Sequence, residues 1–147
     1  MPEPFDNPPR PQQGVRMPPN SVDSEQTILG GLMLNAQAFD EISDVLTADD
    51  FYRADHKMIY EAIIALHTRG EPADVLTVYN ELARNGRADA AGGRPYLSSL
   101  TTNSLGAANI RQYAQIVRDC SMLRQLIAAG DAIVTSALAP NGRETKD

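Results

Sequence analysis

Apolar residues recur every three or four positions along most of the chain between residues 20 and 138, which is the spacing of one face of an α-helix. No two segments of alternating polarity are joined by an Asn-Gly or Asp-Gly turn, so the pattern gives no sign of a β-hairpin. The sequence therefore predicts an all-α fold, with helices over 22–33, 37–46 and 55–68, from Asp74 to Gly86, around 96–100, and from about 107 to 138.

Residues suited to helix ends stand at the edges of these segments. Asn20 or Ser21 can cap the first helix, and Thr47 can cap a single turn that carries Asp49 to Tyr52. Gly30-Gly31 lies inside the first helix, where each glycine costs an isolated helix about 1 kcal/mol. We expect this pair to allow close packing of another element, and the alternative is a kinked helix.

The last predicted helix differs from the others, because it runs for about thirty residues with no proline and a single glycine. Apolar residues recur in it every seven positions, and beyond Met122 the apolar arc widens. A helix that is apolar over a wide arc needs cover on more than one side. We expect its first half to pack on a bundle and its second half to meet a further helix or another protomer. The candidate oligomer interface is Leu123, Leu126, Ile127, Ile133 and Val134.

These patterns divide the chain into four parts. Residues 1–19 hold seven of the ten prolines and are predicted to be a disordered tail. Residues 20–105 are predicted to form a compact globular multi-helix bundle. Residues 106–139 form the long helix, which completes the bundle and begins a dimerising helical hairpin. Residues 140–147 are expected to be a linker that is cut short.

Composition narrows the class of protein. The 147 residues are 42% apolar, and no run of roughly 18 apolar residues suggests a membrane span. The N-terminus lacks the basic and apolar regions of a secretory signal, and the single cysteine, Cys120, fits a reducing compartment. We therefore expect a cytoplasmic protein that does not bind membranes.

The formal charge of −6 is unevenly distributed. Seven acidic residues and no basic one lie between Arg16 and Arg53, which leaves 12 acidic and 13 basic residues elsewhere. Such a block can recruit a basic partner, and Asp40, Glu41 and Asp44 are the candidate docking residues. Acidic helix starts and solvated faces are the plainer explanation.

Six arginines lie between residues 84 and 124, against only two acidic residues. Arg111 and Arg118 are seven positions apart on one helix face, so they are candidates for contact with nucleic acid. No exposed aromatic residues are interleaved with them for stacking on a single strand. Pairing of these arginines with the acidic block, within or between chains, explains them equally well. The alternative function is thus a helical single-stranded-DNA-binding module.

Catalytic signatures are missing from the sequence. It contains no phosphate-binding Gly-x-x-x-x-Gly-Lys-Ser/Thr loop and no Gly-x-Gly-x-x-Gly motif. His56 and His67 would lie about 16 Å apart on one helix, too far to share a metal ion. Cys120 and the Asp49-Asp50 pair have no companion groups. We expect no catalytic, cofactor-binding or metal-binding residues in this chain.

Five stretches, in register, resemble a known family: PPNSVDSEQTILGGLML, DDFYRADHKMIYEAI, GEPADVLTVYNEL, GGRPYLSSL and SLGAANIRQYAQIVRD. They are similar to the N-terminal domain of the DnaB-type bacterial replicative DNA helicase, over about residues 18–140.

The resemblance implies a compact helical domain followed by the first arm of a helical hairpin. In the family these domains pair into dimers, three dimers form a collar on a hexameric ring, and the collar binds primase and contributes to contacts with helicase loaders. The resemblance further implies a motor domain beyond this chain that binds ATP and Mg²⁺ and moves 5′ to 3′ on single-stranded DNA. This chain would then serve assembly and docking, without catalysis.

Overall fold

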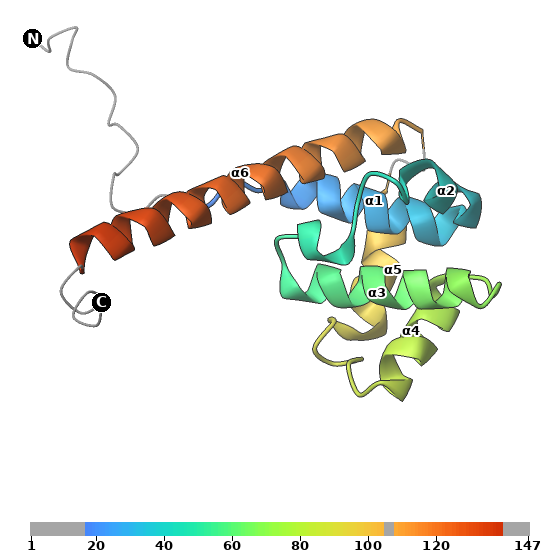
Figure 1. The fold of residues 1–147 in the computed structure, drawn as a ribbon. Helices are drawn as coiled ribbons and strands as arrows, with labels where there is room; N and C mark the ends of the chain where they lie inside the picture. Colours follow the sequence, from blue (N-terminus) through green and yellow to red (C-terminus); the bar gives the residue numbers. More distant parts are fainter. Residues whose placement is uncertain (1–16, 105–107, 140–147) are drawn as a thin grey trace, which may run out of the picture.

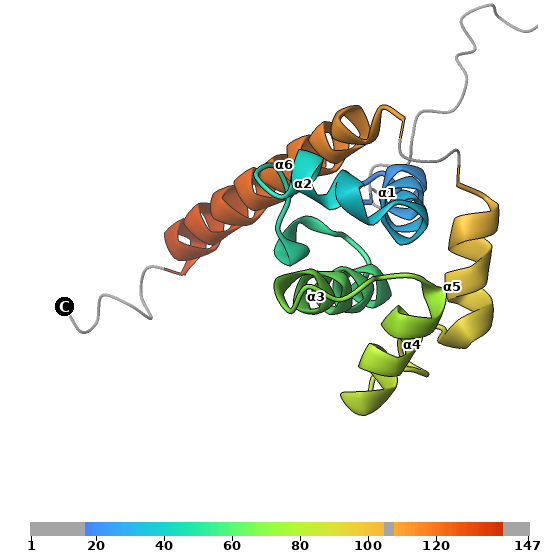
Figure 2. The same cartoon turned by 90° about the vertical axis from the view of Figure 1, so that its right-hand side faces the viewer.

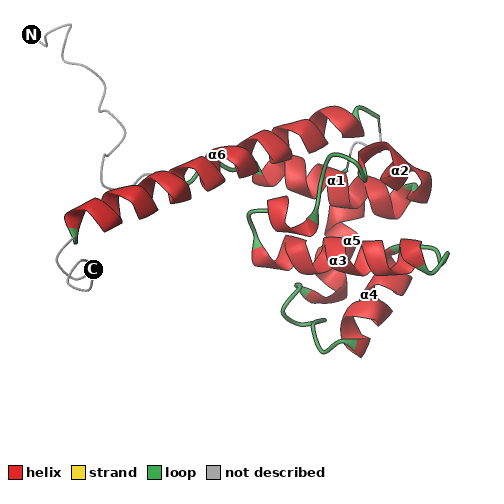
Figure 3. Cartoon of the chain, viewed as in Figure 1, coloured by secondary structure: helices red, strands yellow, loops and turns green. Residues whose placement is uncertain are grey.

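The computed structural model describes residues 17–104 and 108–139, and it is helical throughout, with no strand in those two ranges (Figures 1 and 3). The all-α prediction is confirmed. The predicted tail over 1–19 lies mostly outside the described residues, and the predicted linker over 140–147 lies wholly outside them. In chain order the elements are α1 (Val22–Leu34), η2 (Ala36–Ala38), α2 (Phe39–Ile42), η3 (Ala48–Asp50), α3 (Ala54–Thr68), α4 (Val75–Arg84), α5 (Gly93–Thr102) and α6 (Ile110–Leu138).

Helix α1 is the centre of the bundle. It packs against α3, α5 and the first half of α6, while α4 fills the space between α3 and α5 (Figure 2). The apolar positions of these helices meet in one core, which includes Ile28, Leu29, Leu32, Ile42, Phe51, Ile59, Tyr60, Ile63, Val78, Leu82, Leu97, Leu100, Ile110, Ala114 and Val117. The core draws on every α-helix of the bundle, so these helices stabilise one another.

The glycine in the middle of α1 marks the closest approach between two helices. A Cβ atom added to Gly30 would overlap the carbonyl oxygen of Leu100 and lie 2.8 Å from the Cβ of Ser104. These neighbours belong to α5 and the residues just after it. The prediction that the glycine pair allows another element to pack closely is confirmed at Gly30, because a larger residue would force α5 away.

Two helices differ in extent from their predictions. The segment 37–46 is not one helix, since η2 and the four-residue α2 are followed by a turn in which the N–H groups of Val45 and Leu46 both donate to the carbonyl of Ile42. The turn still buries Leu46, which explains why the apolar spacing looked helical. The long helix begins at Ile110, after Asn109 in a left-handed conformation (φ 63°).

The face of α6 that enters the bundle also differs from the expected one. The repeat that suggested a helix there comprises Tyr113, Cys120, Ile127 and Val134, with Ile116 and Leu123 between them, but the buried residues of α6 are Ile110, Ala114, Val117 and Ser121. Small residues at 114 and 121 allow α6 to lie close to the bundle. Of the repeat, Tyr113 packs partly against the core, whereas Ile116 is 43% exposed although it lies beside the bundle.

Candidate protein-interaction surface

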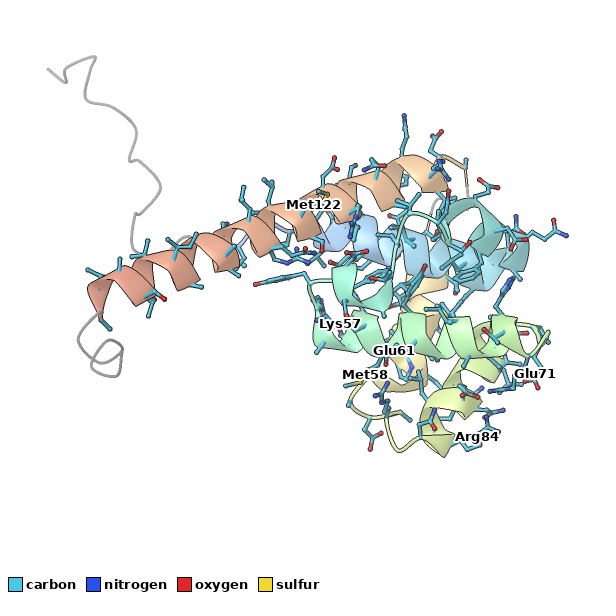
Figure 4. All side chains as sticks on the ribbon, viewed as in Figure 1. Lys57, Met58, Glu61, Glu71, Arg84 and Met122 are labelled. Carbon is cyan, nitrogen blue, oxygen red and sulfur yellow. The ribbon has the colours of Figure 1, made fainter. Side chains whose placement is uncertain are left out.

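The second half of α6 extends beyond the bundle as a single helix (Figure 1). After Ser121, every residue of α6 is exposed or half-buried. We call residues 125–138 the projecting half. At 1.5 Å per residue it is about 20 Å long. Figure 4 shows its side chains standing clear of the bundle beyond the labelled Met122.

Large apolar side chains cover much of this exposed length. The five residues proposed from the sequence as an interface are between 49% and 69% exposed: Leu123, Leu126, Ile127, Ile133 and Val134. The structure therefore brings them together on one exposed length of helix. Sequence reasoning missed Ile116, Met122 and Leu138, which are similarly exposed apolar residues on the same helix. A contiguous apolar surface of this kind is typical of protein–protein contact sites.

The exposed apolar residues form two stripes on α6. Ile116, Leu123, Ile127 and Val134 form the first, and Met122, Leu126 and Ile133 form the second. At about 100° per residue, each stripe lies roughly 130° around the helix axis from the buried residues. One stripe lies on each side of the buried residues. In the projecting half, the side that continues the bundle contact carries the small or polar residues Ala128, Ala132 and Thr135. The apolar surface therefore faces away from the bundle.

A shallow groove of about 520 Å³ lies where the chain before α1 meets α6. Its lining is mainly apolar and comprises Met17, Pro18, Arg124, Ile127, Ala128 and Asp131. Ile127 belongs to both this groove and the first apolar stripe, so the two surfaces are continuous. Asp131 is the only charged residue in the projecting half and forms no ion pair among the described residues.

The arginines between residues 84 and 124 all contact groups within the chain. Arg84 pairs with Glu81, Arg87 pairs with Glu61, and Arg94 lies over the ring of Tyr79. Arg111 pairs with Asp44, Arg118 pairs with Asp50, and Arg124 donates to the carbonyls of Pro19 and Asp50. Arg111 and Arg118, the nucleic-acid candidates, thus serve to hold α6 against the bundle. Their role in nucleic-acid contact stays a prediction without geometric support.

The acidic docking candidates lie together on α2 and the turn after it, all exposed. Asp44 accepts from Arg111 at 3.2 Å, and this hydrogen bond lowers the pKa of the Asp44 carboxyl. Asp40 lies 3.4 Å from His67, and Glu41 contributes its main-chain carbonyl to Arg111. Part of this charge is therefore neutralised inside the chain, and the docking role stays a prediction.

Two buried polar groups join the elements of the bundle, and sequence reasoning named the partners of neither. His56 is fully buried, with Nδ1 2.7 Å from Glu25 of α1 and Nε2 2.6 Å from the hydroxyl of Tyr96 of α5. Asp50, also buried, contacts Arg118 and Ser121 of α6. The partners of each group lie far from it in the sequence, so the folded structure is needed to identify them. His56 is 31 residues from Glu25, and Asp50 is 68 from Arg118.

Other kinds of site find little support in the part of the chain that the structure describes. It contains no group of three or more His, Cys, Asp or Glu side chains placed to hold a metal ion. A hollow of about 340 Å³ lies between α1 and α5, lined in part by Asp23, Gln26 and Asn103. None of the described helices combines the length and hydropathy that crossing a membrane requires.

Comparison with known sequences agrees with the resemblance noted above. The family model described as the DnaB-like helicase N terminal domain matches residues 17–119. The replicative DNA helicase DnaB of Pasteurella multocida is 38% identical over 136 residues, which are 92% of this chain and 29% of that protein. The DnaB of Mycobacterium leprae is 43% identical over 119 residues, 81% of this chain and 20% of that protein.

Solved structures give the same result. The N-terminal domain of DnaB helicase from Mycobacterium tuberculosis superimposes with a TM-score of 0.82 at 41% identity, over 84% of this chain and 85% of that one. The N-terminal domain of the DnaB helicase from Helicobacter pylori superimposes with a TM-score of 0.69 at 22% identity, over 78% and 89% of the two chains, and it shares the fold.

The matched region covers most of the bundle and the start of α6. The chain spans less than a third of the length of the curated helicases that it matches. From the family match, the sequence identities and the shared fold, we conclude that this chain belongs to the DnaB-like helicase N-terminal domain family.

Proposed function

We propose that this chain is the collar domain of a replicative DNA helicase, and that it self-associates through α6 and docks partner proteins. The observation that carries the proposal is the pair of apolar stripes on α6, which the bundle leaves uncovered. Each buried Leu or Ile side chain contributes about 1.5–3 kcal/mol relative to exposure, so covering several of them favours association strongly.

A second copy of this chain is the occupant that we propose for the stripes. Ile116, Leu123, Ile127 and Val134 recur at intervals of seven, four and seven residues, which keeps them on one side of the helix, as two helices require when they pack side by side. Asp131 is the one charge in the projecting half, so a partner helix meets little cost of burying charge. In the helicase, such pairs are expected to build the hexamer.

Light scattering over a range of concentrations tests the self-association. The molar mass of the wild-type chain is expected to rise with concentration, and Leu126→Asp and Ile127→Asp are expected to keep it monomeric. The matched control is Leu76→Asp, because Leu76 is about half exposed on α4 of the bundle. A wild type that stays monomeric at high concentration, or a Leu76→Asp variant that dissociates as fully as Leu126→Asp, contradicts the proposal.

Primase is the first partner that we propose, together with the helicase loader. The structural relative from Helicobacter pylori was studied for its interactions with primase. We propose Asp40, Glu41 and Asp44 as the docking surface. If a basic partner binds there, charge reversal at Glu41, whose side chain forms no ion pair among the described residues, should slow association and flatten its salt dependence.

Binding kinetics with purified primase and, separately, with purified loader distinguish the docking surfaces. Glu41→Lys tests the acidic surface and Leu126→Asp tests α6. A slower association rate for Glu41→Lys alone supports the acidic surface, and faster dissociation for Leu126→Asp alone assigns docking to the apolar stripes. Unchanged binding for Glu41→Lys removes the acidic surface as the docking site.

The full-length relatives that this chain matches are named replicative DNA helicases. We propose that the full protein to which this chain belongs unwinds DNA 5′ to 3′ in the cytoplasm. ATP and Mg²⁺ would act in a motor domain outside this chain. Accordingly, the purified chain is expected to show no ATP hydrolysis, and we expect single-stranded DNA to bind mainly to the motor domain. Turnover by the pure chain, or tight binding of a labelled oligonucleotide at low salt, contradicts this division of labour.

A further inference from the structure

We propose that Asp50 is a positioning residue that fixes the direction in which α6 leaves the bundle, and we call its contacts with Arg118, Ser121 and Arg124 the α6 joint. This inference deepens the proposed function, on which it rests, because the direction of α6 determines where its apolar stripes are presented.

Asp50 uses its two carboxylate oxygens for two different elements. Oδ2 accepts from the backbone N–H of Thr47 at 2.8 Å and from the Thr47 hydroxyl at 3.3 Å, which closes the η3 turn. Oδ1 accepts from Nη1 of Arg118 at 2.9 Å and from the Ser121 hydroxyl at 2.8 Å. The main-chain carbonyl of the same residue accepts from Arg124 at 2.8 Å. One buried residue therefore holds its own loop and two successive turns of α6.

The chemistry of this position requires a carboxylate. Both side-chain oxygens accept hydrogen bonds, and the side chain of an asparagine has only one oxygen. In an Asp50→Asn variant, the NH₂ group of the new amide would face either the donors of Thr47 or the guanidinium of Arg118. Either orientation leaves a donor facing a donor in a buried place, so the joint or the turn must open.

Arg124 completes the joint on its outer side. Its guanidinium donates to the carbonyl of Pro19 at 2.7 Å as well as to that of Asp50, and it lies over the ring of Tyr52 at 5.3 Å from the centroid. These three groups come from the chain before α1 and from η3 and the segment after it. Arg124 is the last residue of α6 with a hydrogen bond to another element of the described chain, so it is the last polar contact that fixes the direction of the helix.

Apolar packing does not fix the direction of α6 at the joint, so the polar contacts must do so. The apolar residues that α6 buries are Ile110, Ala114 and Val117, all in its first eight residues. From Arg118 to Arg124 the contacts with the bundle described above are hydrogen bonds, which are directional, and the stacking of Arg124 over the ring of Tyr52. The projecting half extends about 20 Å further, so a tilt of about 10° at the joint would move its tip by roughly 4 Å.

Pulsed electron-resonance distance measurements on the full chain test the proposal. Spin labels are placed at Asn80→Cys on α4 and Ser136→Cys on α6, both at exposed positions, in a Cys120→Ser background. Labelled protein is diluted into unlabelled protein, so that only distances within one chain contribute. The wild-type joint is expected to give one narrow distribution, and Arg118→Met and Asp50→Asn are expected to shift or broaden it by several ångströms.

The controls separate positioning from folding. Arg87→Met removes an arginine of similar exposure from its pair with Glu61, away from α6, and is expected to leave the distribution unchanged. Arg118→Lys keeps one charged donor and is expected to recover most of the wild-type distribution. If Asp50→Asn does not fold, as judged by circular dichroism, the Arg118→Met and Arg124→Met variants carry the test. Wild-type distributions in folded Arg118→Met and Arg124→Met overturn the proposal.

Failure of the joint and failure of the proposed function are distinguishable. Unchanged distances together with normal self-association of the wild type overturn the joint alone. A shifted distance in Arg118→Met, with no self-association of the wild type at any concentration, supports the joint and contradicts the proposed role of the apolar stripes.

Discussion

The two halves of α6 are one continuous helix in two different environments. The first half buries Ile110, Ala114 and Val117 in the core and is held by three arginines that contact the bundle. The projecting half buries no residue, and its apolar side faces away from the bundle. Helical periodicity alone is therefore a poor guide to burial, because both halves carry apolar residues at helical spacing. What separates them is the side that faces the bundle, which carries Ile110 and Val117 in the first half but only small or polar residues in the projecting half.

This difference shows how one element can serve both stability and binding. The bundle half is stabilised by its own chain, so its substitutions are expected to change folding. The projecting half lacks partners within the described residues, so its substitutions are expected to change association and leave folding alone. A bundle residue can therefore be compared with a matched residue of the projecting half, in dilute protein in which self-association is absent.

The largest contrast is expected between two isoleucines. Ile59 of α3 is fully buried and Ile133 is 69% exposed. Ile59→Ala is expected to reduce the free energy of unfolding by about 2–5 kcal/mol, because it removes buried methyl groups and leaves a cavity. Ile133→Ala is expected to change it by less than about 0.5 kcal/mol. Urea denaturation measures both. Similar losses would mean that the projecting half packs on the bundle in solution.

The next contrast concerns hydroxyl groups. Tyr96→Phe removes the hydroxyl that contacts Nε2 of His56, and it leaves that buried nitrogen without its partner. The expected loss is about 1–3 kcal/mol of unfolding free energy, the cost of an unsatisfied buried polar group. Ser136→Ala removes an exposed hydroxyl from the projecting half, and no measurable loss is expected. A neutral Tyr96→Phe would show that water replaces the hydroxyl without cost.

Local sequence signals were sufficient for most of the fold. The all-α class, a first cap at Asn20 or Ser21 and the close approach at Gly30 were predictable, because each depends on residues near in sequence or on a rule that holds for any helix. The short α2 was not, since a turn can bury Ile42 and Leu46 as a helix would.

The candidate site was predictable in part. The five apolar residues selected for an interface are all exposed, as expected of an arc too wide for one bundle, and their role as an interface stays a prediction. The face of α6 that enters the bundle was not, since Ala114 and Ser121 carry little apolar signal. Pairing of the arginines with the acidic block was one of the alternatives from the sequence, and it is confirmed for Arg111 with Asp44 and Arg118 with Asp50. The individual partners and the choice between pairing within a chain and between chains were not predictable, because they depend on the fold.

A smaller contrast is expected between two aspartates. Asp74 caps α4, and its side chain accepts from the N–H of Thr77 at 2.9 Å. Asp74→Ala is expected to reduce the free energy of unfolding by about 1 kcal/mol, the usual loss on removing such a cap. Asp131→Ala removes a carboxyl with no ion pair within the described residues, and an unchanged midpoint of unfolding is expected. Equal losses would assign Asp131 a partner inside the chain.

The smallest contrast is a dependence on pH. On the bundle, the hydrogen bond from Arg69 lowers the pKa of the Glu81 carboxyl. A carboxyl whose pKa is lower in the folded chain than in the unfolded chain stabilises the fold at pH values above its unfolded pKa, about 4.3. This contribution is lost as the pH falls through the pKa of the folded chain. Urea denaturation at a series of pH values from 7 downward is expected to show a weaker loss in Arg69→Met than in the wild type. Ser136→Ala in the projecting half changes no ionisable group and is expected to follow the wild-type curve, whereas an equal loss in Arg69→Met and the wild type would contradict the role of Arg69.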